Sequence, residues 1–104
     1  MGFNYGDILK QAKVMQQQME KIQEELKNME FEASAGGGVV KVKVNGEQEV
    51  LSVAINKEMV EIEDLEMLED MVLVAINDAI SQSKAESKAR MASLTGGMNM
   101  PGMF

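Results

Sequence analysis

The sequence predicts an α+β fold with a long N-terminal helix, a three-stranded antiparallel sheet and a long C-terminal helix. Apolar residues recur at steps of three and four over two long segments, which is the spacing of one helix face. Between these segments apolar and polar residues alternate, as in strands that bury one face. The 104 residues suffice for a single domain, which we place at residues 1–93, followed by a flexible Gly/Met-rich tail at residues 94–104.

The first helix is predicted from about Asp7 to Met29. Its apolar residues follow heptad spacing and form a narrow seam: Ile8, Ala12, Met15, Met19, Ile22, Leu26 and Met29. The intervening glutamine, lysine and glutamate residues are strong helix formers. A seam of this width requires a partner helix, which is either the second helix of the same chain or a helix of another chain.

Three strands follow the first helix. The first is predicted to turn Phe31, Ala33 and Ala35 to one side, and the second to turn Val40, Val42 and Val44 inward with Lys41 and Lys43 outward. Gly36–Gly38 separate them, as a tight turn or as a bulge where another backbone approaches closely. The pair Asn45-Gly46 is a strong hairpin signal, after which Leu51, Val53 and Ile55 share one face. So short a chain can hardly cover such a sheet alone, and with the seam this predicts a homodimer.

The second helix is predicted to begin near Leu65 with Asp64 as its N-cap. Acidic residues crowd this start, where the helix dipole favours negative charge. A wide apolar face suited to packing on the sheet follows: Leu65, Leu68, Met71, Val72, Ala75, Ile76, Ala79 and Ile80. Beyond Ile80 the bulky apolar residues cease, so this half is expected to project past the core, and Gly96 and Gly97 are expected to end it.

Composition excludes several classes of function. The chain contains no histidine and no cysteine, which removes the usual general bases, nucleophiles and transition-metal ligands. The three glycines lack the flanking residues of a P-loop or a dinucleotide fingerprint. No apolar run is long enough to span a membrane. We therefore expect no enzyme, no cofactor, no metal site, no small-molecule substrate and no membrane partner, in a cytoplasmic protein.

The cations occur in pairs at spacings that place them on common faces. Lys10 and Lys13 are neighbours on the first helix, and Lys84 and Lys88 are neighbours on the second, where Arg90 follows. A formal net charge of −7 argues against a polyanionic partner unless the cations are gathered at one place. Two interpretations stay open, a solvated surface and a surface that contacts phosphates.

Three stretches resemble one known family: "EASAGGGVVKVKVNG" at residues 32–46, "NDA" at residues 77–79 and "LTGGMNMPG" at residues 94–102. In order and spacing they are similar to the YbaB/EbfC family of bacterial nucleoid-associated DNA-binding proteins. The resemblance implies a homodimer with projecting helices that binds double-stranded DNA and alters its conformation, with roles in nucleoid organisation and gene regulation. It implies a cytoplasmic, nucleoid location and DNA contacts on the projecting parts of both helices.

Within that region, charge selects five candidate DNA-binding residues: Lys10, Lys13, Lys84, Lys88 and Arg90. The alternative is a protein-interaction module without DNA binding, in which the exposed coiled-coil-like helices dock a protein partner and the lysines serve only solubility.

Overall fold

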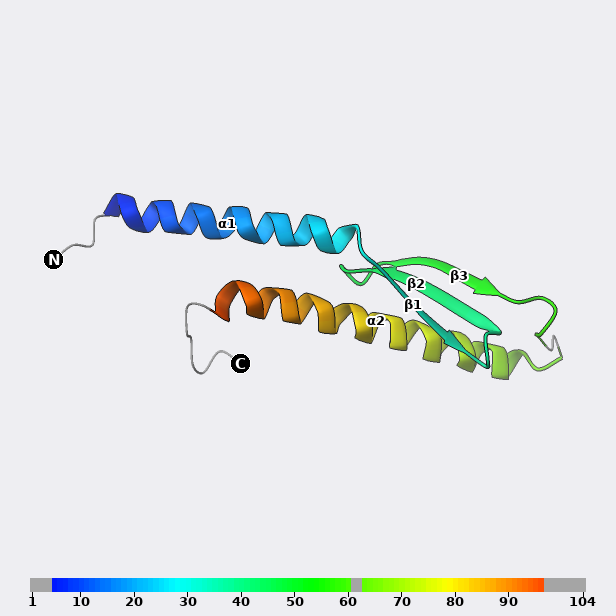
Figure 1. Cartoon of the computed structure of the whole chain (residues 1–104). Coiled ribbons are helices and arrows are strands. Elements are labelled where there is room, and N and C mark those ends of the chain that lie inside the picture. The colour runs from blue at the N-terminus through cyan, green and yellow to red at the C-terminus, as the bar shows by residue number, and fades with distance from the viewer. Residues whose placement is uncertain (1–4, 61–62, 97–104) are drawn as a thin grey trace.

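The computed structural model describes residues 5–60 and 63–96, with only the backbone described for residues 95 and 96. Its elements follow the order helix α1 (Tyr5–Lys27), strands β1 (Glu30–Ala35), β2 (Val40–Asn45) and β3 (Val50–Ile55), and helix α2 (Leu65–Gly96). The three strands form one antiparallel sheet in the order β1-β2-β3 (Figure 1). The predicted α+β fold is confirmed.

Several element boundaries have visible local causes. The carboxylate of Asp64 accepts a hydrogen bond of 3.1 Å from the backbone N–H of Met67, which confirms the predicted N-cap of α2. Helix α1 ends at Lys27, two residues before the predicted end, because the Asn28 side chain donates to the Glu24 carbonyl and the chain then enters β1. Helix α2 includes Leu94 to Gly96, the first residues of the predicted tail, and residues 97–104 lie outside the described residues.

The triple glycine forms the turn between β1 and β2. Gly36, Gly37 and Gly38 have φ values of 66°, 69° and 104°, in the region that residues with a Cβ rarely adopt. The turn interpretation is therefore confirmed. It aligns β1 and β2 so that Lys41 pairs with Ser34 and Lys43 pairs with Glu32.

The core lies between the sheet and α2. Val40, Val42 and Val44 are fully buried, as predicted, and α2 packs against them and against β1. The buried α2 residues are small (Ala75, Ala79 and Ser83), which allows the helix to approach the sheet closely. Lys41 and Lys43 alternate with the buried valines, so they lie on the sheet face that α2 does not cover.

Strand β3 extends beyond this cover. All six of its residues are exposed in the single chain, including Leu51, Val53 and Ile55. Val53 pairs with Val42 and Ile55 with Val40, so both lie on the same sheet face as the buried valines. A single chain thus leaves one flank of its core open.

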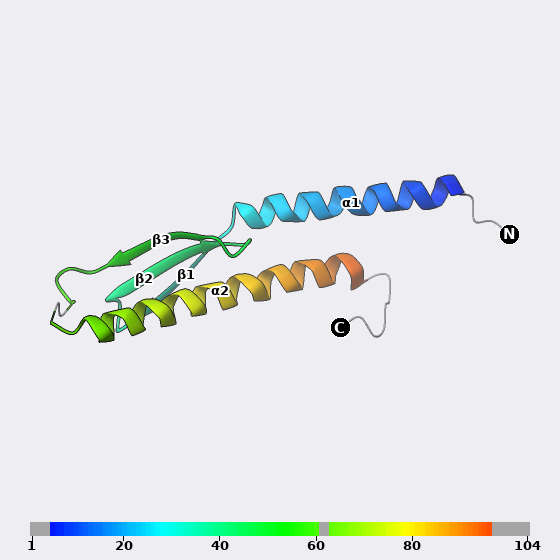
Figure 2. The same ribbon diagram turned by 180° about the vertical axis from the view of Figure 1, so that it is seen from behind.

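Helix α1 and the C-terminal half of α2 project from the same end of the sheet (Figures 1 and 2). Among α1 residues only Leu26 is buried, whereas Ile8 and Met19 of the predicted seam are exposed. The seam therefore meets α2 only near its C-terminal end. The radius of gyration is 20.0 Å, well above the about 13 Å of a compact domain of this length. No helix in the described part of the chain is long and apolar enough to cross a membrane.

Candidate nucleic-acid interface

Charge is segregated along the molecule. Helix α1 and residues 81–96 of α2, which project from the sheet, contain seven cationic and five acidic side chains. The rest of the chain contains three cationic and twelve acidic side chains. The net charge of −7 thus comes from the sheet end, and the projecting helices have a small positive excess. This distribution removes the main sequence argument against a polyanionic partner.

Lys84 and Lys88 lie on the projecting half of α2, one turn apart, and both are exposed. Within the part of the chain that the structure describes, neither forms an ion pair, so both ammonium groups are available to an anionic partner. Gln82 and Ser83 at the start of this half still bond to the sheet, and Lys84 and Lys88 follow them along the helix. Of the three predicted residues on α2, these two are the ones without an ion pair among the described residues.

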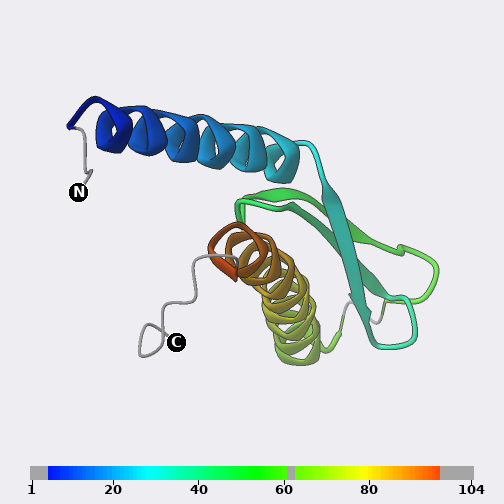
Figure 3. The ribbon, with the colours of Figure 1, turned by 60° about the vertical axis from the view of Figure 1, so that its left-hand side comes forward.

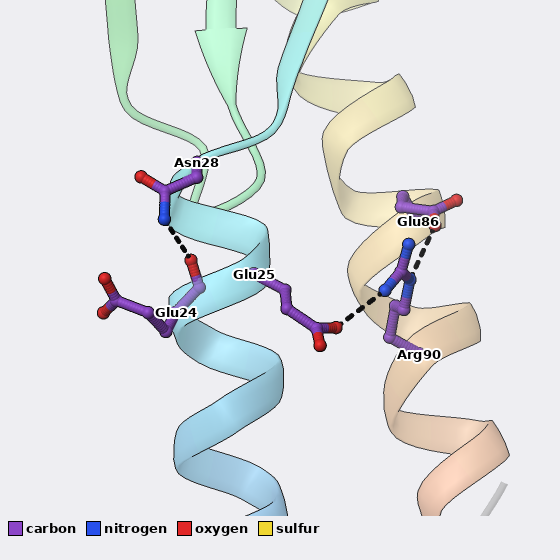
Figure 4. A network of polar contacts seen from close by, with 5 residues as sticks. All are labelled: Glu24, Glu25, Asn28, Glu86 and Arg90. Atoms are coloured by element: carbon purple, nitrogen blue, oxygen red, sulfur yellow. Dashed lines mark hydrogen bonds and ion pairs between the residues drawn. The ribbon is translucent and has the colours of Figure 1, made fainter.

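Arg90 has a different environment. Its Nη1 donates to Oε2 of Glu25 on α1 and its Nε donates to Oε1 of Glu86, both at 2.9 Å (Figure 4). These partners join α1 to α2 where the helices lie closest. The three side chains are 35 to 42% exposed, so each ion pair contributes no more than about 1 kcal/mol. The structure therefore assigns the Arg90 guanidinium to contacts between the helices.

The ion pair also orients α2. Because Arg90 points toward α1, Lys84 and Lys88 lie about 120° and 160° round the helix from that side. They face away from the gap between the helices. The predicted α2 residues thus separate into a lysine pair on the outer side and an arginine on the inner side.

On α1 the predicted pair also separates. Glu25 marks the side that faces α2, and Lys10 lies about 60° from it, whereas Lys13 lies about 120° away. Both lysines are exposed. Lys21, which we did not predict, lies about 40° from Glu25 and on nearly the same side as Lys10. An eleven-residue spacing, close to three helical turns, was the signal in the sequence that links these two lysines.

A groove of about 530 Å³ lies between the two helices. Its lining combines polar and apolar side chains: Gln18, Lys21, Ile22, Glu25, Arg90, Ser93 and Leu94. Two cations and two carboxylates face each other here once Glu86 is included, so the groove itself is close to neutral. Among the described residues, no group of three or more acidic side chains is arranged so that it could hold a metal ion.

Comparison with known proteins places this geometry in context. The model of the YbaB/EbfC DNA-binding family matches residues 1–98. A nucleoid-associated protein of Clostridium novyi is 52% identical, over 99% of this chain and 90% of its own length. One of Thermoanaerobacter pseudethanolicus is 46% identical, over 99% and 93%. The crystal structure of the uncharacterized protein HP0035 from Helicobacter pylori shares the fold, with a TM-score of 0.81, 20% identity, and coverage of 89% of this chain and 98% of that one.

Proposed function

Because the chain belongs to the YbaB/EbfC DNA-binding family, we propose that it binds double-stranded DNA as a homodimer and alters the conformation of the DNA. Its role would be in nucleoid organisation and gene regulation, at the nucleoid in the cytoplasm, in keeping with its relatives, which are nucleoid-associated proteins. The family is a DNA-binding family, in agreement with the expectation that the chain is not an enzyme.

The segregation of charge is the observation that supports this proposal most. Contacts with DNA phosphates require cations at the surface that faces the duplex. Acidic residues elsewhere in the molecule weaken binding little if they lie farther from the duplex than the screening length of about 8 to 10 Å. The molecule is 73 Å long, and its acidic residues concentrate at the end opposite to the projecting helices. Most of the acidic end therefore lies several screening lengths from Lys10 and Lys13 near the tip of α1. Lys84 lies closer to acidic residues, because Ser83 beside it bonds to the turn between β2 and β3, which contains Glu47 and Glu49.

The proposed contacts are made to the backbone of DNA. Exposed lysine side chains on two projecting helices suit phosphates, whereas the sequence contains no recognition motif such as a helix-turn-helix or a zinc finger. We propose Lys84 and Lys88 as the main contacts, with Lys10 and Lys13 as further ones. Arg90 contributes mainly by joining α1 to α2.

Fluorescence anisotropy with several unrelated duplexes tests the DNA proposal. We expect binding to all of them with similar affinity, and a slope of log affinity against log salt of about −4 to −5 for a dimer that neutralises two or three phosphates per chain. Absence of binding to every duplex, even at low salt, would refute the proposal and favour the protein-interaction module.

An open apolar flank supports the homodimer. Gln82 donates to the carbonyl of Glu32 on β1, so the opposite side of α2 faces β3. That side contains Leu73, Ile76 and Ile80, and β3 adds Val53 and Ile55 on the same side of the sheet. We name these five residues the open flank. A second copy would present the same flank, and pairing two flanks would remove both from water.

Sedimentation equilibrium at micromolar concentration tests the assembly. We expect a mass close to twice the chain mass of 11.4 kDa, because an uncovered flank and an edge strand are unfavourable in water. A well-folded monomer at this concentration would contradict the homodimer without affecting the DNA assay.

A further inference from the structure

The turn between β2 and β3 contacts both projecting helices. The backbone N–H of Gly46 donates to the carbonyl of Leu26, at 2.7 Å, in the last turn of α1. The hydroxyl of Ser83, fully buried on α2, donates to the carbonyl of Asn45 at 2.6 Å. We name Leu26, Asn45, Gly46, Gln48 and Ser83 the helix joint.

Gly46 allows the closest contact in the joint. A Cβ at this position would lie 2.4 Å from the Leu26 carbonyl oxygen and 2.8 Å from its C and Cα atoms. All three are backbone atoms, which cannot move aside without moving the helix end. The φ of Gly46 lies outside the left-handed region, so a larger residue here acts through steric contact and not through strain in the turn.

Gln48 completes the connection to α2. Its Nε2 donates to the Ser83 hydroxyl at 3.0 Å and to the Gly46 carbonyl at 2.9 Å. The Asn45 side chain fixes the turn itself, since its Oδ1 accepts hydrogen bonds from the N–H groups of Glu47 and Glu49. The turn is therefore rigid and attached to both helices at once.

Few other contacts determine the direction of α1. Leu26 is its one buried residue, and the Glu25 ion pair with Arg90 is half-exposed. The helix is about 35 Å long, so a small rotation at Leu26 moves its N-terminal residues by several ångströms. Figure 3 shows that α1 leaves the sheet in a direction that differs from the axis of α2.

We propose that the helix joint fixes the direction of α1 relative to α2 and thereby sets the spacing between the lysines of the two helices. Gly46 and Ser83 are positioning residues in this proposal, and neither would touch DNA. The effect on DNA rests on the proposed function, whereas the effect on helix geometry does not.

The chain contains no cysteine, so paired spin labels can be placed at Gln16→Cys and Ala85→Cys without background. Labelled protein is exchanged with an excess of unlabelled protein, so that each measured distance lies within one chain. With Gly46→Ala we expect the mean distance to change by about 3 Å, from a displacement of about 1 Å at the joint amplified along ten residues of helix. With Ser83→Ala we expect a broader distribution, because the turn loses its connection to α2.

Gly37→Ala is the matched control. Gly37 has a left-handed φ of 69° and open space around it, so the change strains a turn without contacting a helix. We expect lower thermal stability and an unchanged distance. A distance that stays the same in Gly46→Ala, or that changes equally in Gly37→Ala, would overturn the proposal.

Measurements of duplex binding test the effect of the joint on DNA binding separately from its effect on helix geometry. If the joint sets the lysine spacing, Gly46→Ala should weaken DNA binding about tenfold and make the salt slope shallower, because fewer cations then meet phosphates. A changed distance with unchanged DNA affinity would overturn the link to DNA. Failure of the wild type to bind DNA would refute the proposed function, while the distances would still test the joint.

Discussion

Aspartate in place of Val53 is expected to abolish the homodimer. Val53 is 45% exposed in the single chain, so the carboxylate would remain solvated there, but in a dimer formed through the open flank it would be buried. Burial of an unpaired charge costs several kcal/mol, and a symmetric interface contains the change twice. We therefore expect the dimer dissociation constant to rise at least about 10³-fold, as measured by sedimentation across a range of concentrations.

Ser52→Asp provides the matched control for this change. Ser52 is the neighbouring residue on β3, it is also exposed, and it pairs with Lys43 on the opposite face of the sheet. The two variants have the same charge and differ only in the face that receives it. A dimer of unchanged stability in Val53→Asp, or equal losses in both variants, would show that the open flank is not the interface.

Local patterns were sufficient to predict the elements. The alternation of Val40, Val42 and Val44, the cap at Asp64 and the three glycines each act over a few residues, so their outcomes follow from short-range geometry. The α1 seam is also a local pattern, and the sequence left its partner open between α2 and a helix of another chain. Its partner depends on where the helix points after Leu26.

The contacts that determine helix geometry join segments far apart in the sequence. Arg90 pairs with Glu25, which is 65 residues away, and Gly46 meets Leu26 through backbone atoms that leave no side-chain pattern. The Arg90 pair with Glu86, by contrast, is local, because the two residues are four positions apart on one helix. Lys21 was missed for a related reason, since its importance depends on which side of α1 faces α2.

The total charge could likewise be predicted from the sequence, whereas its distribution over the molecule could not. The net charge of −7 is a property of composition and argued against DNA, whereas the placement of the acidic residues at the sheet end depends on the fold. The proposed site therefore rests on the arrangement of α1 and α2, and the paired lysines are the part of it that substitution can test most directly.

Glutamine at both Lys84 and Lys88 is expected to weaken DNA binding by about 10³-fold at 0.1 M salt. A dimer would lose up to four phosphate contacts, and each contributes about −0.9 to the slope of log affinity against log salt. The slope should therefore fall in magnitude from about 4 to 5 toward about 1, with equal losses on unrelated duplexes, since phosphate contacts do not depend on sequence. Anisotropy titrations at several salt concentrations measure both quantities.

Replacement of both Lys41 and Lys43 by glutamine is the matched control. It removes as many lysine charges as the α2 double variant, but from the sheet face that α2 does not cover. If the projecting half of α2 contacts the duplex, this control should retain most of the affinity and of the salt slope. Equal losses in the two double variants would mean that total charge determines binding, and the assignment to Lys84 and Lys88 would fail. A loss of affinity confined to the α2 pair would indicate direct contact between these lysines and the duplex. Neither lysine forms an ion pair within the described residues, so their replacement breaks no such pair in the protein.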